Sequence, residues 1–114
     1  MHTPFTEHPP VPQKLRDALK AHPEVVAELQ NRLKTVGRHP GMSKAQRTDQ
    51  FEFAIGALEG ALTRFAIDAA QAIKSAEASG NTTEAEKAKE KRLLMFSCIQ
   101  QVKRSLDELG AFFD

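Results

Sequence analysis

The 114-residue chain has no Trp and no Tyr, and its one cysteine is Cys98. Sites that bind sugars, nucleotides or single-stranded nucleic acid often use those two rings as flat platforms, so their absence disfavours such sites. A lone cysteine excludes an internal disulfide and is typical of a reducing compartment. β-Branched residues are sparse and never alternate with polar residues over the length of a strand, so we expect no sheet.

The chain also lacks an excess of charge of one sign. Its 16 Lys and Arg residues nearly balance 15 Asp and Glu residues, which leaves a formal net charge of +1. Such a balance provides no overall field that would attract nucleic acid or an anionic membrane. No run of about 18 apolar residues is present, and the first residues do not follow the order of a signal peptide. These features predict a cytoplasmic protein that does not enter a membrane.

What the chain does contain is two long helical patterns on either side of Gly80. Apolar positions recur at alternating spacings of four and three, and folding the chain at Gly80 brings the two series together in one register. Ser43 with Gln46 has the spacing of a capping box at the start of the first pattern. The sequence therefore predicts a helical hairpin with arms over about residues 43–79 and 82–112. The first series is Phe51, Ile55, Leu58, Leu62, Phe65, Ala69, Ala72 and Ala76, and the second is Ala85, Ala88, Arg92, Met95, Ile99, Val102, Leu106, Leu109 and Phe113.

The N-terminal third adds a shorter helical pattern and an arm. Four of the six prolines lie in residues 1–12, so we expect a flexible or extended Pro-rich arm there. A further helix is expected over about residues 13–36, kinked at Pro23 because its apolar stripe continues in phase across that residue. Short loops make neighbouring helices antiparallel, so residues 13–114 are predicted to form one domain, an all-α, antiparallel up-down-up bundle.

Two apolar stretches lie outside the predicted contact between the hairpin arms. Each glycine in a helix interior costs about 1 kcal/mol relative to alanine, so a glycine-containing apolar face needs an explanation. The simpler explanation is that helix 13–36 packs there, through Val26, Leu29 and Leu33. The alternative is a groove for a second copy or another protein. The candidate protein-binding residues are Phe53, Gly56, Gly60 and Ile67 on the first arm and Leu93 and Phe96 on the second.

Residues with catalytic or metal-binding spacing were not found. The histidines lack ligand spacing, Cys98 has no histidine within a turn, and no carboxylate pair lies inside an apolar stripe, so we expect no enzyme, cofactor or metal. Arg92 falls in the second apolar series, where it is interpreted as fixing the register with Asp68 as its partner. The predicted function is non-catalytic protein binding in a regulatory, adaptor or inhibitor role, as a homodimer. The alternative is a nucleic-acid-associated regulator that uses the basic loop residues Arg38, Lys44 and Arg47.

Overall fold

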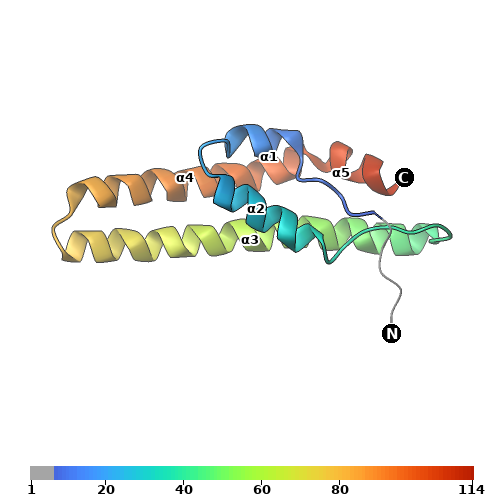
Figure 1. Cartoon of the computed structure of the whole chain (residues 1–114), viewed down its shortest axis with the longest axis horizontal. Coiled ribbons are helices and arrows are strands. Elements are labelled where there is room, and N and C mark those ends of the chain that lie inside the picture. The colour runs from blue at the N-terminus through green and yellow to red at the C-terminus, as the bar shows by residue number, and fades with distance from the viewer. Residues whose placement is uncertain (1–6) are drawn as a thin grey trace.

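The computed structural model describes residues 7–114, and most of these residues are helical. The elements in chain order are α1 (Gln13–Ala18), α2 (Pro23–Leu33), α3 (Lys44–Ala78), α4 (Thr82–Arg104) and α5 (Leu106–Phe113). The α3 and α4 helices fold back on each other as a long hairpin, and α5 continues past the end of α4 (Figure 1). The part of the chain described contains no strand, only one isolated bridge between two loop residues. The predicted all-α bundle built on a helical hairpin is confirmed.

The ends of the hairpin arms form as their capping residues predict. The Ser43 hydroxyl accepts a hydrogen bond from the Gln46 backbone at 3.1 Å, and the Gln46 side chain accepts one from the Ser43 backbone at 2.8 Å. At the turn, Gly80 has a φ of 71°, which glycine adopts without the cost that a Cβ would add. The Asn81 side chain then accepts a bond from the Glu84 backbone at 3.1 Å. Local chemistry therefore sets both arms in place.

The second arm is two helices, which corrects the prediction of one helix over 82–112. Ser105 separates α4 from α5, and its hydroxyl donates to the Gln101 carbonyl at 2.8 Å. A serine that bonds back by four residues competes with the helical backbone bonds and bends the helix. Ser105 is buried, so this bond also satisfies a polar group in the core. The bend keeps Leu109 and Phe113 buried at the end of the bundle.

The first helical region is also two helices, so the prediction of one helix kinked at Pro23 is wrong. Figure 1 shows the chain turning back on itself between α1 and α2. His22, just before the proline, has φ −130° and ψ 66°, outside the helical region, as expected when the proline ring crowds its predecessor. The buried stripe also changes phase, because Val25 and not Val26 is fully buried in α2. The α1 helix consequently lies against α4, while α2 lies against α3.

Residues 7–12 are packed against the bundle, which departs from the expected flexible arm over 1–12; residues 1–6 lie outside the described chain. Glu7 and Arg38 exchange two backbone hydrogen bonds of 3.2 and 3.0 Å. The Gln30 side chain donates to the Pro9 carbonyl at 3.0 Å and accepts from the Val11 backbone at 3.1 Å. Pro9 and Val11 are buried. Prolines remove backbone donors, but here the remaining donors and acceptors find partners in α2 and the following loop.

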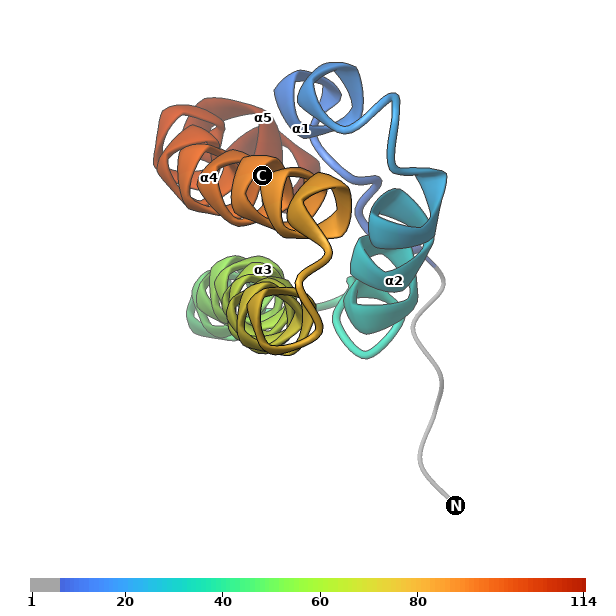
Figure 2. The ribbon, with the colours of Figure 1, turned by 90° about the vertical axis from the view of Figure 1, so that its left-hand side faces the viewer.

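The molecule is elongated, with a radius of gyration of 16.4 Å and extents of 57 × 31 × 20 Å. A compact chain of this length would have a radius of gyration of about 13 Å. The excess arises because α3 continues without a break through Gly56 and Gly60 for 35 residues. The α1 and α2 helices cover one side of the hairpin and leave its tip and its other side without a helix over them (Figures 1 and 2).

Candidate protein-binding surface

The side of the α3–α4 hairpin that faces away from α1 and α2 is called here the open side. Figure 2, viewed along the hairpin, shows α1 and α2 together on one side, and none of the helices of residues 7–114 on the other. On the covered side, α3 and α4 bury a continuous apolar stripe with each other and with α1 and α2. Because a helix repeats every 3.6 residues, side chains opposite that stripe must point away from the core.

The outward-facing stripe of α3 is apolar and contains two glycines. Phe53, Gly56, Gly60 and Ile67 follow one another at spacings of three, four and seven, which places them on one face. Phe53 and Ile67 are 59% and 49% exposed. A Cβ added to Gly56 or Gly60 would have no atom within 4 Å. This face of α3 is therefore a smooth, open strip with a large apolar side chain towards each end.

The explanation that the first helical region covers these glycines is wrong. Leu29 and Leu33 of α2 are fully buried, but they pack against the opposite side of α3. The edge of α3 next to α2 is marked by a shallow pocket of about 300 Å³, lined by α2 and by α3 residues that include Ala61 and Phe65. The physical reason is that α2 follows the larger apolar stripe of α3, which contains Leu58.

The edge of the hairpin next to α2 is also held by an ion pair. Glu24, in the first turn of α2, lies 3.6 Å from the Lys91 ammonium of α4, which lies 5.6 Å from the Phe65 ring centre. A backbone hydrogen bond at the helix N-terminus lowers the pKa of the Glu24 carboxyl, with smaller contributions from the neighbouring His22 and Lys91. This edge is therefore held by α2 itself and is separate from the open side.

On α4, Leu93 and Phe96 lie at the surface, as predicted, with 69% and 44% of their side chains exposed. The guanidinium of Arg92 lies 5.2 Å from the centre of the Phe96 ring, a cation–π distance. Arg92 is exposed, so its predicted place in the contact between the hairpin arms is wrong. Asp68 pairs instead with Arg64, one helical turn away, at 3.5 Å. A charged side chain at that position turns outward because water solvates it at no cost to packing.

Opposite charges line the two helices of the open side, a feature the sequence interpretation missed. Residues 48–63 contain three acids and no base, whereas residues 91–104 contain four bases and no acid. Counting charges by segment would have found this division. Within residues 7–114, the three acids of residues 48–63 and three of the four bases of residues 91–104 form no ion pair; they are Asp49, Glu52 and Glu59 on α3, and Arg92, Lys103 and Arg104 on α4.

Two stripes at helical spacing organise these charges. On α3, Asp49, Glu52, Gly56 and Glu59 follow spacings of three, four and three, so the acids run alongside the glycines. On α4, Arg92, Phe96, Ile99 and Lys103 follow spacings of four, three and four. The hairpin thus carries an acidic stretch on α3 and a basic stretch on α4, with apolar side chains on each.

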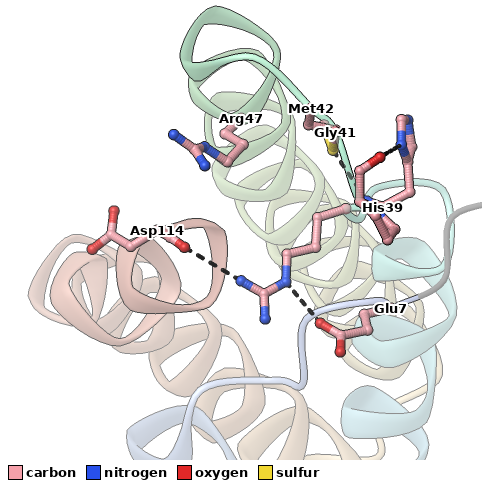
Figure 3. Close-up of a pocket in the computed structure, with 8 residues that line it drawn as sticks. Glu7, His39, Gly41, Met42, Arg47 and Asp114 are labelled. Atoms are coloured by element: carbon pink, nitrogen blue, oxygen red, sulfur yellow. Dashed lines mark hydrogen bonds and ion pairs between the residues drawn. The ribbon is translucent and has the colours of Figure 1, made fainter.

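The basic loop has a different character, because Arg38 is tied into the body of the molecule (Figure 3). Its Nε atom lies 2.7 Å from a Glu7 carboxylate oxygen, its Nη1 atom donates to the Asp114 carbonyl at 3.4 Å, and its guanidinium lies 5.0 Å from the Phe112 ring centre. These contacts join the N-terminal segment, the loop before α3 and the end of α5. Arg38 therefore serves as a cross-link of the fold.

Lys44 and Arg47 lie in the first turn of α3 and not in the loop, and neither forms an ion pair within residues 7–114. Arg47 lines a pocket of about 310 Å³ that also contains Glu7, His39 and Asp114 (Figure 3). Acidic and basic groups are mixed in this pocket, so it lacks the uniformly positive surface that phosphate binding uses. The geometry gives no specific support to the nucleic-acid alternative.

The one cysteine of the chain lies in the core and not at the surface. Cys98 is fully buried, and burial raises its pKa to about 11, so its thiol is protonated at neutral pH and poorly nucleophilic. Between Glu7 and Asp114 no group of three or more metal-binding side chains comes together. No helix in the same stretch is long and apolar enough to cross a membrane.

Comparisons of the chain with protein-family models, with curated proteins and with solved structures gave no match. No known activity therefore transfers to this chain from a relative. The open side is the surface whose composition most needs a function, since its exposed apolar side chains contribute nothing to the core of the bundle.

Proposed function

We propose that this chain is a non-catalytic, cytoplasmic protein that binds protein through the open side of its hairpin, as a regulator, adaptor or inhibitor. The observation that carries the proposal is the exposure of Phe53 and Ile67 on α3 and of Leu93 and Phe96 on α4, the two helices of the hairpin. A homodimer is the simplest form of such binding, because a two-fold contact uses the same surface twice.

Grouping distinguishes these side chains from ordinary surface residues. Single exposed apolar residues are common on soluble proteins and need no explanation. Here four of the five large apolar side chains exposed in the described chain lie on α3 and α4, the two helices of the hairpin; the fifth, Leu106, begins α5. Fully burying one Phe or Leu side chain is worth roughly 1.5–3 kcal/mol, so a partner that covers them gains several kcal/mol.

The glycines support the same proposal. Gly56 and Gly60 weaken α3 by about 1 kcal/mol each relative to alanine, and no neighbour within residues 7–114 requires their small size. A surface without side chains lets another helix approach closely, which strengthens dispersion contacts along the strip. A bound helix therefore accounts for both the glycines and the flanking Phe53 and Ile67.

Site-specific photo-crosslinking in the native host tests the proposal. A photoreactive residue placed at Leu93 or Phe53 should give discrete covalent protein adducts, because these side chains would lie within a contact. The matched control is Ala27, an exposed residue on α2, where no discrete adduct is expected. Equal adducts at all three positions, or none on the open side, would contradict the proposal.

A further inference from the structure

We infer that the chain carries a second binding site, for an extended proline-containing peptide, and that its own residues 7–12 occupy this site. These residues are called here the N-terminal segment. The residues that receive them lie on α2 and in the loop before α3, and are called the seat; they include Gln30, Val36 and Arg38. The seat is separate from the open side, so the inference goes beyond the proposed function and does not depend on it.

The seat holds the N-terminal segment through its main chain. The side-chain amide of Gln30 donates to the Pro9 carbonyl at 3.0 Å and accepts from the Val11 backbone at 3.1 Å. One amide reaches both groups because residues two apart in an extended chain present their polar groups along the same edge. Glu7 and Arg38 also exchange two backbone hydrogen bonds, as when a peptide is added to the edge of another strand. Contacts of this kind do not require the bound segment to belong to the same chain.

The side chains of the N-terminal segment alternate between the seat and water. Pro9 and Val11 are fully buried, whereas Pro10 between them is exposed. Pockets for alternate side chains are the usual way in which an extended peptide is selected. Pro12 has φ −54° and ψ 143°, close to a polyproline helix, and prolines restrict a free peptide to such angles before it binds. The seat therefore fits a proline followed two residues later by an apolar residue.

A charged contact lies at the start of the N-terminal segment. The Nε atom of Arg38 lies 2.7 Å from a Glu7 carboxylate oxygen (Figure 3). Contacts with the Asp114 carbonyl and the Phe112 ring position the same guanidinium independently of Glu7. Both partners of the ion pair are partly exposed, and ion pairs at the surface contribute little to stability, so another acid could replace Glu7. The expected peptide has an acid two residues before its proline.

The N-terminal segment can leave the seat without the unfolding of a helix. None of its residues belongs to a helix, and it is joined to the bundle at Pro12, whose carbonyl accepts from the Leu15 and Arg16 backbone at the start of α1. A ligand tethered by a short connection has an effective concentration of roughly 1 mM, so it excludes weak peptides and yields to tighter ones. Residues 7–12 thus act as a built-in competitor, and a partner that supplies a tighter peptide would displace them.

Binding of a labelled peptide with the sequence of residues 7–12 to the full chain tests the inference. Two variants loosen the N-terminal segment and leave the seat unaltered: Glu7→Arg removes the charged contact, and Val11→Ser removes an apolar one. Fluorescence anisotropy should show that the peptide binds each variant at least tenfold more tightly than the wild type, because the chain's own segment then competes less. Circular dichroism checks that both variants fold. Glu7 is exposed, so Glu7→Arg decides the test if Val11→Ser unfolds.

Gln30 locates the peptide on the seat. Adding Gln30→Ala to the Glu7→Arg chain should weaken peptide binding at least tenfold, because both amide contacts are lost. The matched control is Gln71→Ala, at an exposed glutamine on α3, which should leave peptide binding unchanged. A peptide that carries serine in place of Val11 should also bind at least tenfold more weakly, since it lacks the buried apolar side chain.

Two outcomes would overturn the inference. If the folded Glu7→Arg chain does not bind the peptide up to about 1 mM, residues 7–12 are a fixed part of the fold and not a replaceable ligand. If Gln30→Ala and Gln71→Ala have equal effects, the peptide lies elsewhere on the molecule. Both outcomes leave the proposed function standing, because crosslinking at Leu93 and Phe53 tests the open side separately.

Discussion

The two sides of the hairpin are built from the same helices but have opposite surroundings. On the covered side, Leu58, Met95 and Cys98 are fully buried among α1, α2 and the other hairpin arm. On the outer surface of the same two helices, Phe53 and Leu93 have comparable apolar bulk and remain mostly exposed. Apolar side chains thus serve folding only where another part of the chain covers them. The open side has the composition of a contact surface that residues 7–114 leave uncovered.

The largest expected difference between the two sides is in the cost of truncating a leucine. Leu58→Ala should lower the free energy of unfolding by about 2–5 kcal/mol, because it leaves a cavity in a fully packed core. Leu93→Ala, the same change on the open side, should shift the unfolding free energy of the monomer by no more than about 0.5 kcal/mol. Urea unfolding followed by circular dichroism measures both, since the chain has no Trp or Tyr for fluorescence.

Leu58→Ala and Leu93→Ala must be compared in dilute protein, where the chain is monomeric. A dimer buries Leu93, so its truncation would then lower stability in a concentration-dependent way, whereas the effect of Leu58→Ala would persist at every concentration. Equal losses from the two changes in the monomer would show that the open side contributes to the fold, against the assignment made here.

The second expected difference is in how the free energy of unfolding depends on pH, and it arises on the covered side alone. Burial raises the pKa of the Cys98 thiol from 9.0 to about 11, so the folded state favours the protonated form. That contribution is complete below pH 9 and is lost as pH rises from about 9 to about 11. The loss amounts to at most about 3 kcal/mol, from the two-unit shift. Unfolding free energies measured across this range would show the decline.

Cys98→Ala is the control for this decline. All other groups are the same in the wild type and the variant, so the two chains should share one part of the slope and differ by the part that the thiol contributes. Parallel curves for the two chains would contradict the assignment of Cys98 to a dry core. A thiol reagent at pH 8 provides an independent check, since it should react with Cys98 only as fast as the chain opens.

The hairpin could be predicted from sequence because its information is local and repeated. Capping by Ser43 and Asn81, the left-handed Gly80 and the two apolar series each indicate the same arms. The position of Leu93 and Phe96 at the surface followed from the same periodicity. The exposed glycines were also identified, although the neighbour first favoured for them was wrong.

The placement of α1 and α2 could not be predicted, because it depends on which faces meet across the bundle. Pro23 is compatible with a kink or with a reversal, and the difference lies in the backbone angles of His22. A polar residue such as Ser105 gives no sequence signal for a helix break, since serine also occurs inside helices. The binding of residues 7–12 depends on Gln30, which is 19 residues from its partner Val11. Such pairings are set by tertiary packing.

The smallest expected effects come from the glycines of the open side, and they have a favourable sign. Gly56→Ala and Gly60→Ala should each stabilise the monomer by up to about 1 kcal/mol, because alanine loses less backbone entropy and no atom lies within 4 Å of its Cβ. Gly80→Ala is the matched control and should destabilise by about 1 kcal/mol or more, because its φ of 71° disfavours a side chain. Thermal unfolding by circular dichroism measures all three.

A loss of stability at Gly56 in dilute solution would mean that this face is already covered within one chain. In contrast, weakening of the dimer by Gly56→Leu, with the monomer at least as stable as the wild type, would show that the space above the glycine belongs to the partner.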